Sequence, residues 1–225
     1  MIDSGSAMLN ALLQGGYEPG ITGIYGAPAT GKSLCCMLAA VACAKRMKKV
    51  AYVDTEQNFH AERALQLCPD TDALGRILRL CPGSFSELNS TVVQLGELAP
   101  HLGLICVDSL TSDYRLGLAG AEDHKSVNDE FVKITEELSR ISKENHIPVV
   151  ITAQAYLDIE NKAQRMVGGF ILPRRCKVIL LLEKKGRMRY AILEKHPTLS
   201  HREERFRITD TGIEPIPPRS FPEVL

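Results

Sequence analysis

The sequence has no tryptophan, and aromatic residues make up only 5% of its 225 residues. It has no apolar run of about 18 residues, so no transmembrane helix is expected. The formal net charge is zero, which removes any overall electrostatic pull toward nucleic acid. The N-terminus lacks a basic segment followed by an apolar one, so no signal peptide is expected. Together these absences favour a globular protein of the cytoplasm that does not contact a membrane.

Cysteine is present seven times, but never as a C-x-x-C pair and never in a Cys/His cluster with metal-ligand spacing. Most of the cysteines lie within apolar periodic segments; Cys36 and Cys43, for example, are seven residues apart in one predicted helix. We therefore predict reduced thiols in the core of a cytoplasmic protein, and no cysteine metal site.

The order of apolar and polar residues predicts an α/β fold. Up to residue 154, short apolar runs alternate with segments of helical periodicity, which is typical of a mostly parallel sheet with helices on both faces. The predicted strands are 21–25, 50–53, 77–80, 102–107 and 147–152, and the predicted helices are 33–47, 59–67, 85–95 and 127–141.

The pattern changes after a polar stretch at 155–169. Three short predicted strands, at 177–183, 189–194 and 205–208, leave little room for helices between them, which favours an antiparallel extension of the sheet. We expect one domain over residues 1–214, followed by a proline-rich and flexible tail at 215–225.

A phosphate-binding pattern lies between the first predicted strand and helix. Residues 26–33 fit G-x-x-x-x-G-K-[ST], whose backbone N–H groups and helix N-terminus suit phosphate oxygens. In this pattern the lysine lies near the β- and γ-phosphates and the final hydroxyl binds Mg²⁺. We predict that ATP and Mg²⁺ are bound, with these nucleotide-binding residues: Gly26, Ala27, Pro28, Ala29, Thr30, Gly31, Lys32, Ser33 and Leu34.

Three polar residues end other predicted strands, where side chains reach the ligand crevice of a parallel sheet. Asp108 suits the Mg²⁺ shell beside Ser33, although it could instead cap the next segment. Glu56 could orient and deprotonate an attacking water, or be a solvated loop acid. Gln154 could sense the γ-phosphate, which its position alone indicates only weakly.

Longer segments resemble the RecA-like recombinase family. Residues 53–56 (Val-Asp-Thr-Glu), with Glu62 and Arg63, resemble the "D-T-E … E-R" block of the archaeal and eukaryotic strand-exchange recombinases. Residues 107–111, with Tyr114 and Arg115, resemble their "V-D-S … Y-R" block, and 151–154 resemble their "I-T-N-Q" strand end. The similarity covers residues 4–214 and implies a RecA-like P-loop NTPase core.

Within that family, the chain is most similar to short archaeal paralogues of the recombinase RadA. The segments that carry this similarity are 174–177 (Arg-Arg-Cys-Lys), 191–196 (Ala-Ile-Leu-Glu-Lys-His), 206–209 and 212–214. The chain is also expected to begin directly at the core, without the N-terminal helical domain of RadA.

The resemblance implies roles for single residues. Glu56 matches the catalytic glutamate, and Gln154 matches the glutamine that links the γ-phosphate to the DNA-binding loop. Arg63 matches the arginine that stacks on adenine; otherwise it is a solvated helix charge. The segment that caps ATP from a neighbouring subunit corresponds to Lys195, His196 and Pro197, which could otherwise form only a strand end and turn.

Basic residues are concentrated in one stretch. Between residues 160 and 189 there are nine basic residues and two acidic ones. With the family resemblance this predicts contact with single-stranded DNA, aided by base stacking on Tyr156 and Phe170; the alternative is a solvated hairpin. The predicted DNA-binding residues are Lys162, Arg165, Arg174, Arg175, Lys184, Lys185 and Arg187.

Two departures from the family pattern weigh against filaments and strand exchange. We expect no segment upstream of the core that could carry a Phe-x-x-Ala linking motif, and the loop at 116–124 is short and contains Glu122 and Asp123. We therefore expect an accessory protein of homologous recombination and DNA repair, with weak ATP hydrolysis, that assists a RadA-type recombinase. A junction-processing nuclease and a second copy of the chain are further candidate partners. The alternatives are a nucleotide-gated protein-binding module and a KaiC-type signalling ATPase without DNA binding.

Overall fold

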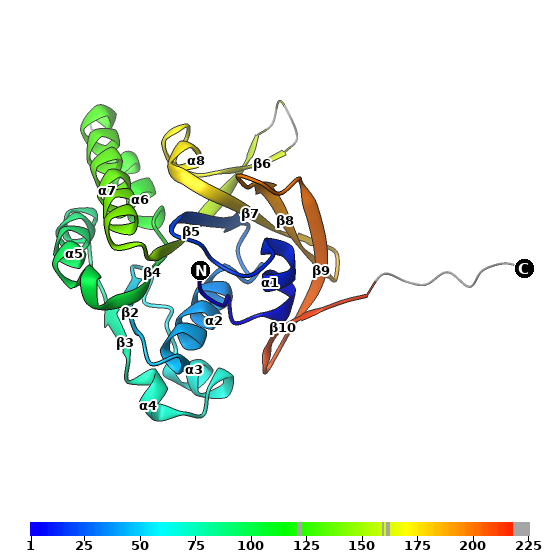
Figure 1. The fold of residues 1–225 in the computed structure, drawn as a ribbon. Coiled ribbons are helices and arrows are strands. Elements are labelled where there is room, and N and C mark those ends of the chain that lie inside the picture. The colour runs from blue at the N-terminus through cyan, green and yellow to red at the C-terminus, as the bar shows by residue number, and fades with distance from the viewer. Residues whose placement is uncertain (121–122, 159, 161–162, 218–225) are drawn as a thin grey trace, which may run out of the picture.

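The computed structural model describes residues 1–120, 123–158, 160 and 163–217, and its ribbon is drawn in Figure 1. Its strands are β1 (Gly20–Gly26), β2 (Lys49–Asp54), β3 (Ile77–Leu80), β4 (Leu102–Asp108), β5 (Pro148–Asp158), β6 (Ala163–Met166), β7 (Cys176–Lys185), β8 (Met188–Lys195), β9 (Arg202–Thr209) and β10 (Gly212–Pro215). Its helices are α1 (Ala7–Leu13), α2 (Lys32–Lys45), α3 (Ala61–Leu67), α4 (Thr71–Leu74), α5 (Phe85–Leu98), the short 3₁₀ helix η1 (Ala99–His101), α6 (Ser112–Gly120), α7 (His124–Asn145) and α8 (Ile171–Arg175).

The strands form one sheet in the order β10-β9-β8-β7-β1-β5-β4-β2-β3, with β6 paired to β5 alone. The six strands from β7 to β3 run parallel, whereas β8, β9 and β10 add to β7 as antiparallel neighbours. The predicted fold class, a mostly parallel RecA-like sheet with a C-terminal antiparallel extension, is therefore confirmed.

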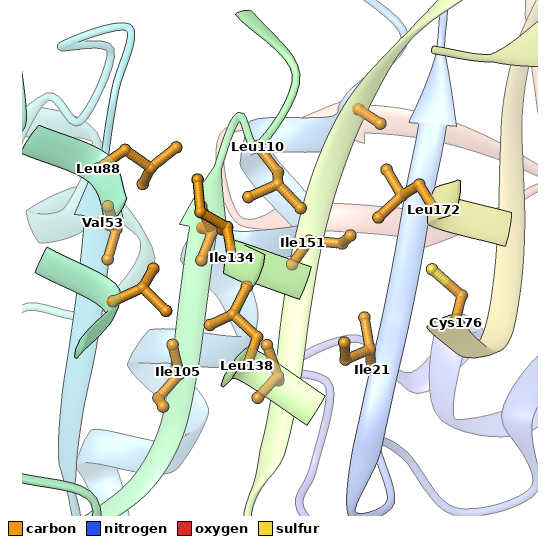
Figure 2. Close-up of a cluster of buried hydrophobic side chains, with 14 of the residues drawn as sticks. Ile21, Val53, Leu88, Ile105, Leu110, Ile134, Leu138, Ile151, Leu172 and Cys176 are labelled. Carbon is orange, nitrogen blue, oxygen red and sulfur yellow. The ribbon is translucent and has the colours of Figure 1, made fainter. Parts of the chain in front are cut away.

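Helices cover both faces of the sheet, which explains why its central strands are apolar throughout. All seven residues of β4 are buried. On one face, α5 and α7 place Leu88, Ile134 and Leu138 over strand residues such as Val53 and Ile151, as Figure 2 shows. On the other face, α1 and α2 pack against the strands, and α2 is apolar nearly all round because neighbours surround it.

The structure differs from the sequence prediction between residues 112 and 169. Residues 116–120, interpreted as part of a loop, belong to α6, which buried Tyr114 anchors by stacking on Phe131. The polar stretch at 155–169 is not irregular throughout: β5 continues to Asp158 and pairs with β6 in an antiparallel hairpin. The sequence did not predict this hairpin, because the hairpin extends beyond the core and therefore needs no apolar face that would mark its strands.

Several smaller expectations can be compared with the structure. Six of the seven cysteines are buried, in agreement with their predicted place in the core, and Cys81 is exposed. Within the described residues no helix is long and apolar enough to cross a membrane. β10 ends at Pro215, and the Ile216 N–H donates to the Arg205 carbonyl oxygen at 2.8 Å; residues 218–225 of the predicted tail lie outside the described residues.

Phe131 should be the most informative residue for the stability of this fold. Its side chain is fully buried on α7, with its ring centroid 4.1 Å from that of Tyr114. Replacement by alanine removes a buried aromatic ring and leaves a cavity, so Phe131→Ala should lower the free energy of unfolding by about 3–5 kcal/mol. Urea denaturation measures this change, with the exposed Val93→Ala on α5 as the control. A loss below about 1 kcal/mol would contradict the packing described.

Candidate nucleotide-binding site

The loop at residues 26–33 joins β1 to α2, as the sequence predicts. Two of its positions require glycine. Gly26 has a φ of 156°, and a Cβ there would lie 2.1 Å from the Leu182 carbonyl oxygen of β7. Gly31, with a φ of 112°, precedes α2, and its Cβ would lie 3.2 Å from Ile208. The loop can therefore fold back over the end of β1 only without side chains at these positions.

Lys32 lies inside this loop. Its Nζ donates hydrogen bonds to the carbonyl oxygens of Gly26 and Ala27 at 3.0 and 2.9 Å. Burial lowers the pKa of this ammonium group, although the nearby carboxylates of Asp108 and Glu56 oppose that effect. The bonded partners are neutral carbonyls, so phosphate oxygens would give this charge stronger hydrogen bonds.

Asp108 is the buried acid at the end of β4. Its Oδ1 accepts hydrogen bonds from Ser33 Oγ at 3.2 Å and Thr152 Oγ1 at 2.5 Å, and its Oδ2 accepts one from the Tyr52 hydroxyl at 3.0 Å. Burial raises the pKa of Asp108, while these three hydroxyl donors act in the opposite direction. The structure thus brings together the two residues predicted to hold Mg²⁺. A hydroxyl and a carboxylate oxygen beside a phosphate-binding loop fit the ligand preference of that ion.

Glu56, Gln154 and Arg115 form a chain of polar contacts across the mouth of the site. The Gln154 Nε2 donates to Glu56 Oε1 at 3.5 Å, and Gln154 Oε1 accepts a hydrogen bond from Arg115. The Gln154 backbone N–H also donates to Thr111 Oγ1 at 2.9 Å, which fixes where the side chain begins. The two predicted catalytic residues therefore lie in contact, Glu56 just after the carboxyl end of β2 and Gln154 within β5, level with the end of β1.

Two cavities lie at this edge of the sheet. One, of about 400 Å³, is lined by residues that include Lys32, Glu56, Asp108 and Gln154. The other, of about 380 Å³, is lined by Leu34, Met37, Arg63 and residues 208–210, among others. Ser33 and Asn58 line both, so the cavities adjoin. The first suits phosphates and the second, which is more apolar, suits a base.

Arg63 lies in the second cavity but makes its own contacts. Its guanidinium donates to the carbonyl oxygens of Thr209 and Asp210 at 2.7 and 2.8 Å, and thereby ties α3 to the turn between β9 and β10. The contact with adenine stays a prediction, whereas the hydrogen bonds of Arg63 show a structural role that the sequence did not reveal.

The predicted cap residues lie away from this site. Lys195 pairs with Ile179, and its Nζ donates to the carbonyl oxygens of Pro173 and Cys176 at 2.9 and 2.7 Å. Cys176 is paired with Ile21 at the opposite end of β1 from the phosphate loop, roughly 16 Å along the strand. His196 and Pro197 follow Lys195, and His196 Nδ1 accepts from the backbone N–H of Leu199 at 3.1 Å.

The predicted DNA-binding residues do not form one surface. Lys184, Lys185 and Arg187 lie at the tip of the β7–β8 hairpin, beyond the end of β1 that carries the phosphate loop. Arg174 and Arg175 belong to α8, which precedes the opposite end of β7. The remaining two are Arg165, which is on β6, and Lys162, which lies outside the described residues.

Acidic neighbours divide this basic set further. Arg165 pairs with Asp158 at 3.4 Å, Arg175 pairs with Glu136, and Lys185 pairs with Glu183 at 2.7 Å. In the part of the chain that the structure describes, no ion pair is formed by Arg174, Lys184 or Arg187. All three side chains are exposed, so their charges are accessible to a phosphate backbone.

Sequence reasoning missed several residues that build the site. Tyr52 and Thr152 donate to Asp108, Arg115 holds Gln154, and Asn58 lines both cavities. Tyr52 and Thr152 gave no signal because they lie within apolar strands, where a hydroxyl residue is an ordinary constituent. Arg115 and Asn58 did have a signal in the sequence. Arg115 belongs to one of the blocks that carry the family resemblance, and Asn58 closely follows another.

Comparison with known proteins identifies the family. The Rad51 family matches residues 1–77 and 84–216. The chain belongs to the Rad51 family. Within it, the chain is 36% identical to the "DNA repair and recombination protein RadB" of Thermococcus gammatolerans, covering 96% of this chain and 99% of that protein. The protein of the same name from Methanoculleus marisnigri is 34% identical, with 96% and 98% covered.

A solved structure gives the same result. A chain described as the RadB recombinase superposes with a TM-score of 0.83 and 30% sequence identity, covering 96% of this chain and all of that one. The predicted resemblance to the short paralogues of the RecA-like recombinases is thus confirmed, and these relatives are RadB proteins.

The pKa of Asp108 gives a pH-dependent test of the site. Because burial raises this pKa, the folded state favours the protonated carboxyl more than the unfolded chain does. Ionisation therefore costs stability as pH rises through the folded-state pKa. The free energy of unfolding of Asp108→Asn minus that of wild type should therefore be larger at pH 8 than at pH 4. Urea denaturation in EDTA measures both values. If the free energy of unfolding of wild type instead rises relative to that of the variant as pH increases, burial does not disfavour the charged form of Asp108.

Proposed function

We propose that this chain is an ATP-binding and DNA-binding accessory protein of homologous recombination and DNA repair that hydrolyses ATP weakly. In that role it would assist a RadA-type recombinase. The observation that carries the proposal is the convergence of Lys32, Ser33 and Asp108 with Glu56 and Gln154 at one edge of a Rad51-family sheet. The names of its relatives, which are DNA repair and recombination proteins, support the same reading.

The chemistry follows from the positions of the side chains. The loop N–H groups and Lys32 would bind the β- and γ-phosphates, and Ser33 and Asp108 would hold Mg²⁺. When bound, that ion neutralises charge on the phosphate oxygens. Glu56 would orient a water molecule toward the γ-phosphorus and accept its proton on a carboxylate oxygen. Gln154 lies between Glu56 and Arg115 and would register whether the γ-phosphate is present.

Slow turnover is expected for a single copy of the chain. In the predicted scheme, Lys195 of a neighbouring copy caps the nucleotide, whereas Lys195 of the same chain is bonded to backbone oxygens near the opposite end of the strands. Without a neighbour, the positive charge of that cap is missing, and stabilisation of the transition state is weaker.

DNA contact is proposed at two surfaces. One is the β7–β8 hairpin tip, with Lys184 and Arg187. The other is the β5–β6 hairpin with the α8 segment, where Tyr156 and Phe170 are 50% and 83% exposed and can stack on bases. Both contain basic residues suited to a phosphate backbone. Because the formal net charge of the chain is zero, DNA binding would depend on these local basic surfaces. A cytoplasmic location fits this role.

Lys32 allows the coupling of nucleotide and DNA to be tested. Lys32→Ala should weaken Mg-ATP binding at least tenfold, since a hydrogen bond to a charged group contributes about 1.5–3 kcal/mol. In fluorescence anisotropy with single-stranded DNA, Mg-ATP should change the affinity of wild type and leave the variant unaffected. Lys45→Ala, on the exposed far end of α2, is the matched control. Absence of any binding at low salt would remove the DNA part of the proposal.

The hairpin tip makes a separate prediction about salt. Replacing Lys184, Lys185 and Arg187 together with alanine should reduce the slope of log affinity against log salt by about 2, because each phosphate contact on a single strand contributes about 0.7. The control replaces the same number of exposed charges, Lys45, Arg46 and Lys48, beside the other end of the sheet. Equal slopes in the two triple variants would mean that the hairpin is only a solvated surface.

A second candidate is a nucleotide-gated binding module without productive turnover, which the distant position of Lys195 favours. Glu56→Gln distinguishes the two. If hydrolysis matters, the variant should bind ATP normally and lose activity in repair assays. If binding alone matters, it should keep that activity.

A further inference from the structure

The loop that carries Glu56 is held from beneath by one buried carboxylate. Asp54, at the end of β2, is fully buried, and its Oδ1 accepts a hydrogen bond from the Asn58 backbone N–H at 2.9 Å. Its Oδ2 accepts one from the Phe59 N–H at 3.0 Å. Both ends of the loop, residues 54 and 58–59, are thereby fixed, and Glu56 lies between them.

Arg79 supplies the counter-charge from the neighbouring strand. β3 is the outermost strand on this side of the sheet, and Arg79 on it directs Nε and Nη2 to Asp54 Oδ2 at 2.9 and 2.7 Å. The guanidinium carbon also lies 6.0 Å from the centre of the Phe59 ring. A fully buried carboxylate needs such a partner, and this one is supplied by a side chain that is itself 39% exposed.

The same group reaches the Mg²⁺ side of the site. The Phe59 ring packs edge-on against the Tyr52 ring, with centroids 4.9 Å apart, and the Tyr52 hydroxyl donates to Asp108. Asn58, whose N–H binds Asp54, donates from Nδ2 to Glu56 Oε2 at 3.1 Å. Displacement of the loop would therefore move the carboxylate of Glu56 directly and the environment of Asp108 through Tyr52.

We propose that Arg79 and Asp54 are positioning residues for Glu56, so that an ion pair on the sheet edge controls the rate of the chemical step. This inference rests on the proposed hydrolysis of ATP. Neither residue lines the cavity that suits phosphates, so neither touches the nucleotide there. A small misplacement of the group that orients water costs turnover while leaving the binding of the substrate unchanged.

The test compares Arg79→Ala with Arg79→Lys and with Arg76→Ala. Arg76 lies just before β3, and its guanidinium bonds the Asp72 carbonyl oxygen, away from the loop. Arg79→Ala should lower kcat about tenfold and change the Kd for ATP less than about twofold. Arg79→Lys should recover part of the rate, and Arg76→Ala should match wild type. A loss of ATP affinity equal to the loss of kcat, or an equal loss in Arg76→Ala, would overturn the proposal.

A double-mutant cycle separates positioning from general loosening of the fold. In single-turnover hydrolysis, Arg79→Ala should cause no further loss in a Glu56→Gln background, because the residue through which it acts has been removed. The same tenfold loss in both backgrounds would show that Arg79 does not act through Glu56. Thermal unfolding of each variant identifies any that do not fold.

One measurement does not depend on turnover. Amide hydrogen exchange at Asn58 and Phe59 should be at least tenfold faster in Arg79→Ala and in Asp54→Asn than in wild type, while exchange within β4 is unchanged. If wild type shows no hydrolysis, the proposed ATPase activity fails, but exchange still decides whether the ion pair holds the loop. Unchanged exchange at both amides would overturn the inference.

Discussion

The structure of the nucleotide site depends on the burial of one carboxylate, that of Asp108. Three hydroxyl groups from different elements converge on it: Ser33 from the start of α2, Tyr52 from β2 and Thr152 from β5. These bonds join the phosphate loop to β2, which ends just before Glu56, and to β5, which carries Gln154. Burial still raises the pKa of Asp108, so the charge is stabilised only in part by its donors. These bonds therefore hold the three elements together around a carboxylate whose charged form is disfavoured by burial.

The parallel sheet also explains why the candidate site residues lie close together. The carboxyl ends of β1, β2 and β4 meet at one edge beside Gln154 of β5, and the β7–β8 hairpin extends past the same edge beside β1. Arg189 on that hairpin reaches the Ala29 carbonyl oxygen of the phosphate loop at 3.5 Å. The basic β7–β8 hairpin is thus in direct contact with the loop that would bind phosphates. A movement of the loop could therefore reach the hairpin through this contact.

Much of this arrangement could be predicted from the sequence, because apolar runs, the G-x-x-x-x-G-K-[ST] spacing and polar residues at strand ends report local constraints. The parallel central strands and the gathering of Glu56, Gln154, Ser33 and Asp108 at one edge of the sheet follow from these constraints, whereas the order of the strands does not. What could not be predicted depends on contacts between distant segments. The β5–β6 hairpin exists because its two strands pair, and the basic residues at 160–189 are separated by the direction of β7, which no charge count reveals.

The position of Lys195 has a geometric consequence. The nucleotide loop and this lysine lie toward opposite ends of the same strands, so one copy presents an open site at one pole and the predicted cap toward the other. Two copies that used this contact would meet through different surfaces rather than through one shared, self-complementary patch. Such a pair completes one site and leaves the other exposed. Repeating the contact would give either a ring or an open chain of copies, depending on the rotation between neighbours, and in both cases every copy would point in the same direction.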